Sequence, residues 1–319
     1  MATKTPSRHG ISRRGFLQAT ALATAGGVAT GCLPAKITRR AMLEHGLIDA
    51  HVHVWTPDTG RYPLAKGYDR SNMRPASYTP EELFADCKPL GVTRIVLIQM
   101  NFYEWDNTYM TDMMRKHDGV FGGVAQVDEN DAPRDHMKAL ADKGVRGFRI
   151  RPGKDNGKTW LDGDGMHAMW KYGAESGLNM CCLIDTEHLP SVSAMCNRYP
   201  ETPVVIDHFA RLGVTGEVRE SDLDTLCDMA RHRHCKVKAS AFYALGKKKG
   251  PYLDFLPIIR RVVDAFGPER VMWASDCPFQ VVGGHTYRES VELVTKHADF
   301  LSASDRDWIL RKTAAEVFF

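Results

Sequence analysis

The stretch that decides the fold is LIDAHVH at residues 47–53, a largely apolar run that ends in two histidines. Leu, Ile, Ala and Val at most of its positions indicate a buried strand of the kind found in parallel sheets. His51 and His53 are two residues apart, so their side chains leave a strand on the same face. Two imidazoles in that arrangement can hold one cation. The pair alone is a weak motif. It supports a metal site only if other parts of the chain supply further ligands beside it.

Seven further short apolar runs follow and alternate with amphipathic stretches that predict helices. Together the eight predicted strands lie at residues 47–55, 94–100, 120–128, 145–152, 179–185, 203–210, 235–244 and 270–279. Gly91, Gly144, Gly177 and Gly267 each follow a helical stretch and precede a strand, as expected of the left-handed residue that closes a helix. The pattern predicts an α/β fold, a (β/α)8 barrel of TIM type in a single domain at residues 46–319. A dinucleotide-binding sheet would instead carry a glycine-rich loop after its first strand.

Composition limits the class of protein further. The 319 residues are 43% hydrophobic and 25% charged, which is typical of a soluble globular chain. The formal net charge of +3 comes from the first 31 residues, which carry four basic residues and no acidic one. The remainder is close to neutral and has no basic cluster of the kind that nucleic-acid binding requires. We therefore expect a small-molecule substrate and no nucleic-acid partner.

Residues 1–31 are typical of an export signal. Arg13 and Arg14 precede a weakly apolar stretch at residues 19–29, a pattern that resembles a twin-arginine signal peptide and predicts the twin-arginine export machinery as a partner. The alternative is an ordinary N-terminal helix, which Gly26 and Gly27 would weaken. Cys32 follows a segment similar to a lipoprotein cleavage box. Cleavage there would leave a lipid-anchored chain with a linker at residues 32–45, and otherwise we expect a free periplasmic protein.

Polar residues also end the sixth and eighth predicted strands. Asp207 and His208 follow one apolar run, and Asp276 follows the other. Either carboxylate alone could be a helix cap or a member of an ion pair. In a parallel barrel, however, the carboxyl ends of all strands meet at one face, where active sites lie. His208 and Asp276 should therefore converge on His51 and His53. Imidazole and carboxylate together suit a divalent ion such as Zn²⁺, and a catalytic site leaves one position open for water.

Two further groups are candidates for a substrate pocket. Arg149 and Arg151 end the fourth strand on one face, and a guanidinium can bind a carboxylate through two parallel hydrogen bonds. The alternative is that one of them belongs to an ion-pair network inside the barrel. Tyr243 follows the seventh strand and could line the pocket or stand at its rim as an ordinary aromatic residue.

Three fragments, LIDAHVHVW, VVIDHFARLG and RVMWASDCPF, resemble the signature segments of the amidohydrolase-related family. The resemblance spans residues 46–319 and implies a TIM-like barrel. That family includes sugar-lactone and pyrone dicarboxylate lactonases, muconolactone-type hydrolases and nonoxidative decarboxylases. The resemblance implies that His51 and His53 are metal ligands or polarise the substrate, and that Asp276 is a metal ligand or the general base. It implies that His208 is a ligand or a neighbour that shuttles protons. Gln99 and Tyr103, in the loop after the second strand, would bind the substrate.

The fifth predicted strand departs from part of that family. Its sequence, CCLID at residues 181–185, lacks the histidine that metal-dependent decarboxylases supply, and Asp185 stands nearest that position. The departure implies the lactonase branch, in which some members bind zinc and others work without metal. We therefore expect a hydrolase that opens a small polar cyclic ester, with water activated by a divalent metal, zinc in the first place, or by Asp276 alone. A nonoxidative decarboxylase of an unsaturated or aromatic acid and a binding protein without turnover are the alternatives.

Overall fold

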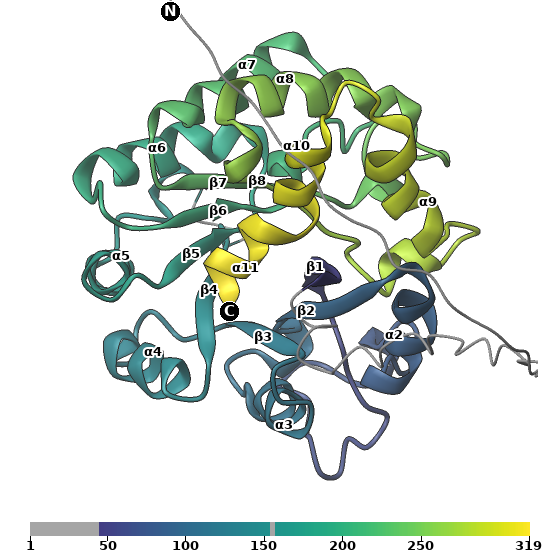
Figure 1. The fold of residues 1–319 in the computed structure, drawn as a ribbon. Coiled ribbons are helices and arrows are strands. Elements are labelled where there is room, and N and C mark those ends of the chain that lie inside the picture. Colours follow the sequence, from purple (N-terminus) through teal and green to yellow (C-terminus); the bar gives the residue numbers. More distant parts are fainter. Residues whose placement is uncertain (1–44, 154–156) are drawn as a thin grey trace, which may run out of the picture. The chain divides into compact units, whose positions relative to one another are not determined.

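The chain forms an eight-stranded parallel barrel of TIM type, which confirms the predicted fold class (Figure 1). The computed structural model describes residues 45–153 and 157–319. Each strand pairs with the next in sequence order. The strands are β1 (Leu47–Val52), β2 (Val92–Ile98), β3 (Phe121–Ala125), β4 (Val145–Ile150), β5 (Asn179–Cys182), β6 (Val204–Ile206), β7 (Cys235–Ala239) and β8 (Val271–Trp273). All eight match predicted strands, but they end earlier than predicted, so several site residues lie in the turns that follow them.

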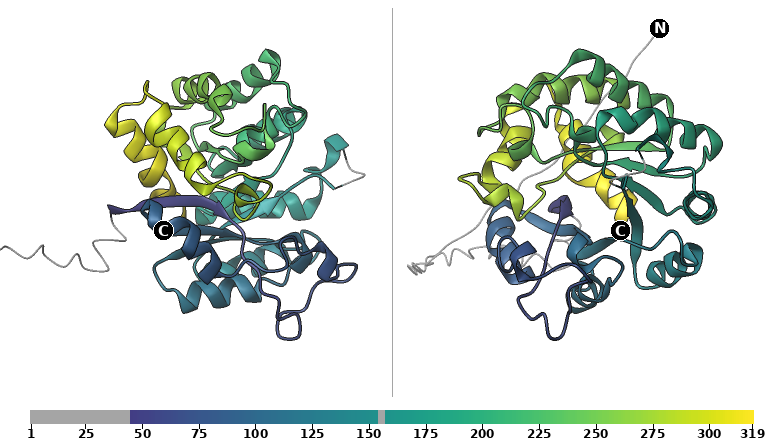
Figure 2. Two further views of the ribbon diagram at one scale, coloured as in Figure 1. Left: turned by 90° about the vertical axis from the view of Figure 1, so that its right-hand side faces the viewer. Right: turned by 180° about the vertical axis from the view of Figure 1, so that it is seen from behind.

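Helices surround the sheet and alternate with its strands (Figures 1 and 2). They are α2 (Pro80–Cys87), α3 (Thr108–Lys116), α4 (Pro133–Ala141), α5 (Asp164–Ser176), α6 (Leu189–Arg198), α7 (Glu220–Asp228), α8 (Leu256–Phe266), α9 (Tyr287–Glu292), α10 (Ala303–Asp307) and α11 (Thr313–Phe318). Thr79 caps α2 in a reciprocal capping box with Glu82. The four glycines predicted to close helices all have positive φ. This confirms the repeat of helix, glycine and strand.

The barrel closes where β1 meets β8, and this seam differs from the other strand pairs. Instead of a ladder it has one isolated bridge, between Val52 and Cys277. The carboxylate of Asp49 crosses the seam, where it accepts hydrogen bonds from the Ser275 backbone N–H at 2.9 Å and from the Tyr287 hydroxyl of α9 at 2.6 Å. Burial raises the pKa of Asp49 to about 6, against the opposing effect of these hydrogen bonds. One side chain therefore joins the first strand to the last.

A register shift in β1 decides which side chains face the inside of the barrel. Ile48 and Ala50 pack in the interior cluster, so a regular strand would turn His51 toward the outer helices. The pairing of β1 with β2 is irregular between Asp49 and Val52. An irregularity of this kind can re-aim a side chain. It leaves Asp49 directed at α9 while His51 and the following His53 lie on the side of the site.

The short helix α11 covers one end of the barrel (Figure 1). Its Ala314, Val317 and Phe318 pack against interior residues of the strands. The side-chain amide of Asn179 in β5 donates to the Val317 carbonyl at 3.3 Å and ties the helix to the sheet. Cys181 is part of the same cluster and is a free thiol. With this end filled, a ligand has to enter from the carboxyl ends of the strands.

The predicted export signal at residues 1–31 and the predicted linker at residues 32–45 lie outside the described residues, except for residue 45. Among the residues that the structure does describe, no helix is both long and apolar enough to span a membrane.

We expect the seam to depend on Asp49. Asp49→Ala should lower the free energy of unfolding by roughly 3 kcal/mol, because it leaves a buried N–H and a buried hydroxyl without their acceptor. Tyr287→Phe removes one of these hydrogen bonds and should cost about 1 kcal/mol. Urea denaturation followed by circular dichroism measures both. Equal losses in the two variants would show that the carboxylate does not join the strands.

Candidate active site

A cavity of about 340 Å³ opens at the carboxyl ends of the strands. Its polar lining includes His53, Arg149, His208, Arg211, Tyr243 and Asp276. His51 is fully buried beside these residues, within 3.5 Å of Asp276. The structure thus brings together the histidines and the aspartate that the sequence placed at three separate strand ends.

The cluster centres on one carboxylate oxygen, Oδ1 of Asp276. The Nε2 atoms of His51, His53 and His208 lie 3.5, 3.4 and 3.9 Å from it. The other oxygen, Oδ2, accepts a hydrogen bond from the Tyr243 hydroxyl at 2.6 Å. Three imidazoles and a phenol therefore surround a single buried carboxylate.

Hydrogen bonds on the far side of the imidazoles fix their protonation. Nδ1 of His53 lies 2.9 Å from the Ile98 carbonyl, which can only accept, so Nδ1 carries the proton. Nδ1 of His208 lies 2.8 Å from the Ser240 hydroxyl, which itself donates to the Lys238 carbonyl. Nε2 of both rings then faces Asp276. Two imidazole nitrogens that face one carboxylate oxygen can share a proton with it or hold a metal ion.

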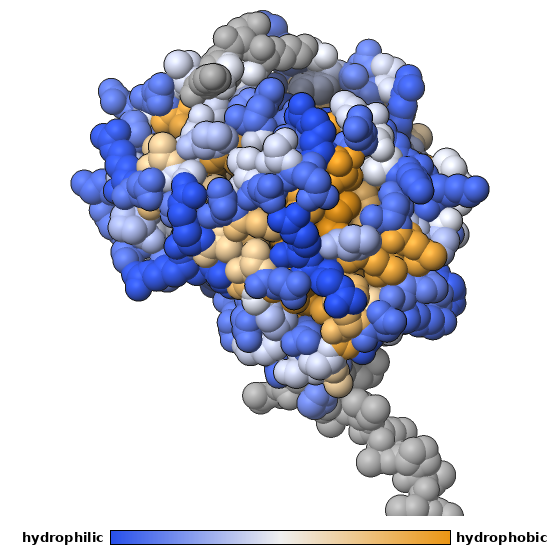
Figure 3. Space-filling model, turned by 90° about the horizontal axis from the view of Figure 1, so that it is seen from above, coloured by the Kyte–Doolittle hydropathy of each residue, from blue (hydrophilic) through white to orange (hydrophobic). Residues whose placement is uncertain are grey.

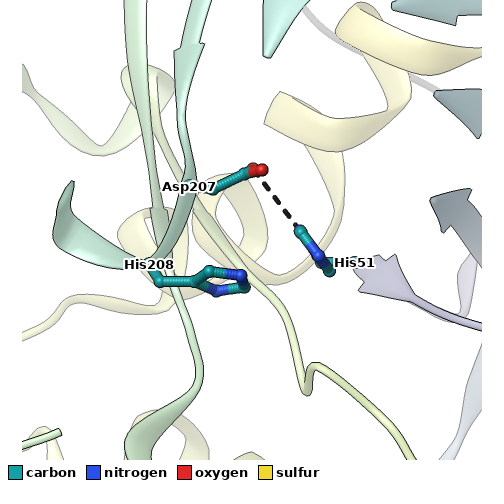
Figure 4. Close-up of side chains that lie close together, drawn as sticks. All are labelled: His51, Asp207 and His208. Atoms are coloured by element: carbon teal, nitrogen blue, oxygen red, sulfur yellow. Dashed lines mark ion pairs between the residues drawn. The ribbon is translucent and has the colours of Figure 1, made fainter. Parts of the chain in front are cut away.

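His51 has charged neighbours on both sides. Its Nε2 lies 2.7 Å from a guanidinium nitrogen of Arg149. A guanidinium can only donate, so Nε2 is the acceptor of this hydrogen bond. Its Nδ1 lies 3.4 Å from Oδ1 of Asp207, which comes directly after β6 (Figure 4). The Lys238 ammonium of β7 is 3.0 Å from the same carboxylate oxygen. Figure 4 shows the His51 ring between Asp207 and His208.

Burial and charge set the protonation of these groups. Burial lowers the pKa of His51 and of His208, so both rings are neutral at pH 7. Burial alone would raise the pKa of Asp276, but the positive charge of His208, His51 and His53 in their protonated state and a hydrogen bond from His53 outweigh burial and hold the pKa well below its usual range. The same holds for Asp207, whose pKa burial would raise and Lys238, His51 and Arg149 together lower. Both carboxylates are therefore ionised in a site shielded from water.

The backbone at the site is strained. His208 and Asp276 have φ of 52° and 66°, in the left-handed region that residues with a side chain rarely adopt. Phe209, Ala210 and Arg211 continue in the same conformation. Such residues persist only where surrounding contacts hold them, and they gather at functional sites. Here the strained turn after β6 directs His208 toward Asp276.

The donor set fits a divalent metal ion. One ligand atom from each of His51, His53 and Asp276 lies within 4.8 Å of the others. Zinc bonds of about 2.0–2.1 Å in a tetrahedron place neighbouring ligand atoms about 3.4 Å apart. The contacts of Asp276 Oδ1 with the two histidines, 3.5 and 3.4 Å, agree with that spacing. Coordination through His51 would require the Arg149 guanidinium to leave Nε2.

The predicted substrate-binding residues divide into two groups. Arg149 and Tyr243 line the cavity, and Arg149 also belongs to the internal ion-pair network, 3.4 Å from Asp207. Arg151 is exposed and lines a neighbouring hollow of about 470 Å³ that also includes Arg149. Gln99 and Tyr103 do not line the cavity. The Gln99 amide donates to two backbone carbonyls of the loop after β2, and Tyr103 packs among aromatic side chains, so both shape that loop.

Sequence reasoning missed Lys238 and gave Asp207 no role in the site. The available signal was the strand CKVKA at residues 235–239, where lysine alternates with smaller residues inside a predicted buried strand. Asp185, the residue nearest the missing histidine, pairs with Arg211 at 3.2 Å and stays outside the cluster.

A larger cavity lies elsewhere, on the outer surface beside α7 and α8. It measures about 760 Å³ and is lined by apolar side chains such as Val218, Leu223 and Phe300 together with exposed charges. Figure 3 shows hydrophobic side chains between hydrophilic ones on this side of the molecule. The histidines of the site are absent from its lining. The smaller cavity is therefore the candidate active site.

A TIM-type barrel with one histidine in β1 and another directly after it, a third after β6 and an aspartate after β8 defines a class of barrel hydrolases that work with imidazole and carboxylate groups. The chain belongs to the amidohydrolase family, because the sequence model of that family matches residues 48–319. This confirms the resemblance that the three sequence fragments indicated.

Known relatives agree with the lactonase-like branch. The chain is 29% identical to an L-fucono-1,5-lactonase of Burkholderia ambifaria over 75% of its own length and 82% of that protein. It is 27% identical to a 4-sulfomuconolactone hydrolase of Hydrogenophaga intermedia, over 75% of this chain and 77% of that one. An amidohydrolase structure from Burkholderia multivorans, which contains bound zinc, shares the fold with a TM-score of 0.71 and 21% identity, over 85% of this chain and 98% of that one.

Metal binding can be tested directly. Protein stripped with a chelator should bind Zn²⁺ in isothermal titration calorimetry, and His53→Ala and Asp276→Asn should each weaken binding at least tenfold, because each removes one ligand of a small set. His234→Ala is the matched control, since His234 precedes β7 at the opposite end of the barrel and pairs with Glu201. Unchanged affinity in Asp276→Asn would contradict the ligand set.

Proposed function

We propose that this protein is a lactonase that opens a small polar cyclic ester by attack of water. The observation that carries the proposal is the ionised Asp276 at a cavity wall, with three imidazoles and the Tyr243 hydroxyl around it. Hydrolysis of an ester needs a group that takes a proton from water and a group that stabilises the charge on the carbonyl oxygen. The names of the two relatives, both lactone hydrolases, support the substrate class.

Asp276 is the base in this mechanism. Its carboxylate is ionised and borders the cavity, so it can take the proton of the attacking water and return it to the alkoxide that leaves as the ring opens. Tyr243 holds Oδ2 and leaves Oδ1 to face the histidines. Burial and the nearby Asp276 raise the pKa of Tyr243, so its hydroxyl stays a donor. His208, 3.9 Å from Oδ1, is placed to assist the proton transfer.

Arg149 supplies fixed positive charge at the cavity wall. It is buried, and its guanidinium borders both His51 and the cavity. A preorganised cation in a dry site stabilises a developing oxyanion more than it would in water. We assign Arg149 to the carbonyl oxygen or to a substrate carboxylate, and Arg151 to the outer part of the substrate.

A divalent ion, zinc in the first place, is part of the proposal, with His51, His53 and Asp276 as its ligands. When bound, such an ion would lower the pKa of water toward about 7 and polarise the carbonyl group. In a metal-free site Asp276 alone would activate water, with His51 and His53 beside the carbonyl.

The alternatives have less support in the site. A decarboxylase would draw a histidine from β5, but β5 ends in two buried cysteines and the cavity receives Leu183 from the turn that follows. A binding protein without turnover would not need an ionised carboxylate held among three imidazole rings. The assay described next tests both alternatives, because a decarboxylase releases CO₂ and a binding protein releases neither CO₂ nor acid.

Activity should depend on Asp276. Asp276→Asn is expected to lower kcat 10²- to 10⁴-fold, because general-base catalysis contributes about that much. A panel of sugar lactones and carboxylated lactones, followed by acid release in a pH-indicator assay, measures the loss, and CO₂ release is recorded in parallel. Asp185→Asn is the matched control and should keep wild-type kcat. Full activity in Asp276→Asn, or CO₂ release without acid from lactones, would refute the mechanism.

We also propose that the chain is exported through the twin-arginine pathway and is either free in the periplasm or anchored by lipid at Cys32. The support is the sequence around Arg13 and Arg14 and the box before Cys32. Cell fractionation should find the Arg13→Lys/Arg14→Lys variant in the cytoplasm and the wild type outside it. If lipid holds the chain, Cys32→Ser should release it from membranes. Continued export of the double-lysine variant would exclude the pathway.

A further inference from the structure

Lys238 has no part in the mechanism above, yet it lies at the centre of the barrel. It is in β7 with 0% of its side chain exposed. A buried ammonium group is costly unless it is paired. Its partner is Oδ1 of Asp207 at 3.0 Å, also with 0% exposure. Neither residue of this pair lines the cavity, so the mechanism above does not explain why the pair is buried here.

The geometry connects this ion pair to His51. Oδ1 of Asp207 faces Lys238 and also lies 3.4 Å from Nδ1 of His51. Nε2 of His51 accepts from Arg149 at 2.7 Å, so the neutral ring carries its proton on Nδ1. Nδ1 lies 3.2 Å from the Lys238 ammonium and 3.4 Å from Oδ1 of Asp207, and of these two groups Asp207 is the one that can accept its proton. A carboxylate behind an imidazole fixes the ring and its tautomer in this way.

The charges around His51 are balanced only while Lys238 is present. Arg149 and Lys238 are positive, and Asp207 and Asp276 are negative. Without Lys238 the sole cation near Asp207 in this cluster would be Arg149, whose guanidinium is already 3.4 Å from Oδ2. Asp207 would then draw Arg149 from its place at Nε2 of His51. Lys238 therefore keeps the carboxylate and the guanidinium on opposite sides of the ring.

The C-terminal helix shields the pair from water. The Lys238 ammonium lies 5.3 Å from the centre of the Phe318 ring, which is buried in the barrel floor. An aromatic face stabilises a cation without offering it a competing acceptor of hydrogen bonds. The ammonium is thus left with Asp207 and His51 as its polar neighbours.

We propose that Lys238 is a positioning residue for His51: with Asp207 it holds the imidazole so that the unprotonated Nε2 lies toward Arg149 and Asp276. The inference rests on the proposed function only in that His51 belongs to the reacting site. Lys238 does not line the substrate cavity, and it acts on His51 through Asp207 and through its own position 3.2 Å from Nδ1.

The test measures the tautomer of His51 without substrate or metal. In ¹⁵N-histidine NMR of chelator-treated protein at neutral pH, with the signals assigned by His51→Gln, wild type should show Nδ1 protonated and Nε2 bare. The double variant Asp207→Leu/Lys238→Met removes both charges together, which buried ion pairs often tolerate. We expect it to lose that single tautomer. A wild-type ring protonated on Nε2, or the wild-type tautomer in the double variant, would overturn the proposal.

Stability and Co²⁺ affinity separate positioning from a purely structural role. Lys238→Met alone leaves Asp207 short of a partner and should lower the melting temperature, and the double variant should regain most of that loss. Co²⁺ affinity, followed by visible absorption, should stay 10- to 100-fold below wild type in both, as for loss of a partner behind a metal ligand. Recovery of both properties in the double variant would make the pair merely structural.

Lys236→Met is the matched control. Lys236 is two residues earlier in β7, on the same face of the strand, and should leave the His51 tautomer and Co²⁺ affinity unchanged. A change as large as that of Lys238→Met would contradict the assignment. None of these measurements uses a lactone. A wild type that hydrolyses no lactone would refute the proposed function, while the NMR comparison would still decide the role of Lys238.

Discussion

The site exists because the first strand meets the last. His51 and His53 come from β1 and Asp276 follows β8, so the distance between ligand atoms is set by how the barrel closes. That closure has one isolated bridge, and the carboxylate of Asp49 supplies further contacts by joining Ser275 and Tyr287. Two backbone hydrogen bonds, from Asp276 N–H to the His51 carbonyl and from His53 N–H to the Cys277 carbonyl, align the same residues. The seam that completes the fold therefore also assembles the reacting groups.

The balance of charge in the buried cluster is a second constraint on the site. The buried cluster holds two cations and two carboxylates, while burial keeps two of the imidazoles neutral. A divalent ion would add positive charge that no further carboxylate in this cluster balances. Such an excess favours whatever brings negative charge into the cavity: a hydroxide, a substrate carboxylate or the oxyanion of ester cleavage. Charge balance thus connects the proposed metal to the proposed chemistry.

The sequence predicted the order and place of all eight strands, because buried parallel strands are apolar throughout and stand out between helices. It also placed His51, His53, His208, Asp276 and Tyr243 at one face. The sequence did not identify Lys238 as a residue of the site, because alternating lysines predict a strand with one face in water. In the structure that face is the inside of the barrel. The direction of the His51 side chain depends on a register shift in the pairing of β1 with β2, which no pattern of residues in the sequence predicts. Gln99 and Tyr103 were assigned to substrate binding from the family resemblance alone, and their side chains contact the loop after β2 instead of the cavity.

The position of α11 has a consequence for how the molecule is made. Residues 313–318 leave the ribosome only after every strand has been synthesised, and they fill the barrel floor beneath Lys238. Until then the interior of the strands has no apolar cover and the ammonium has a path to water. The floor beneath Lys238 can therefore close only after all eight strands have been made, whatever the order in which they pair.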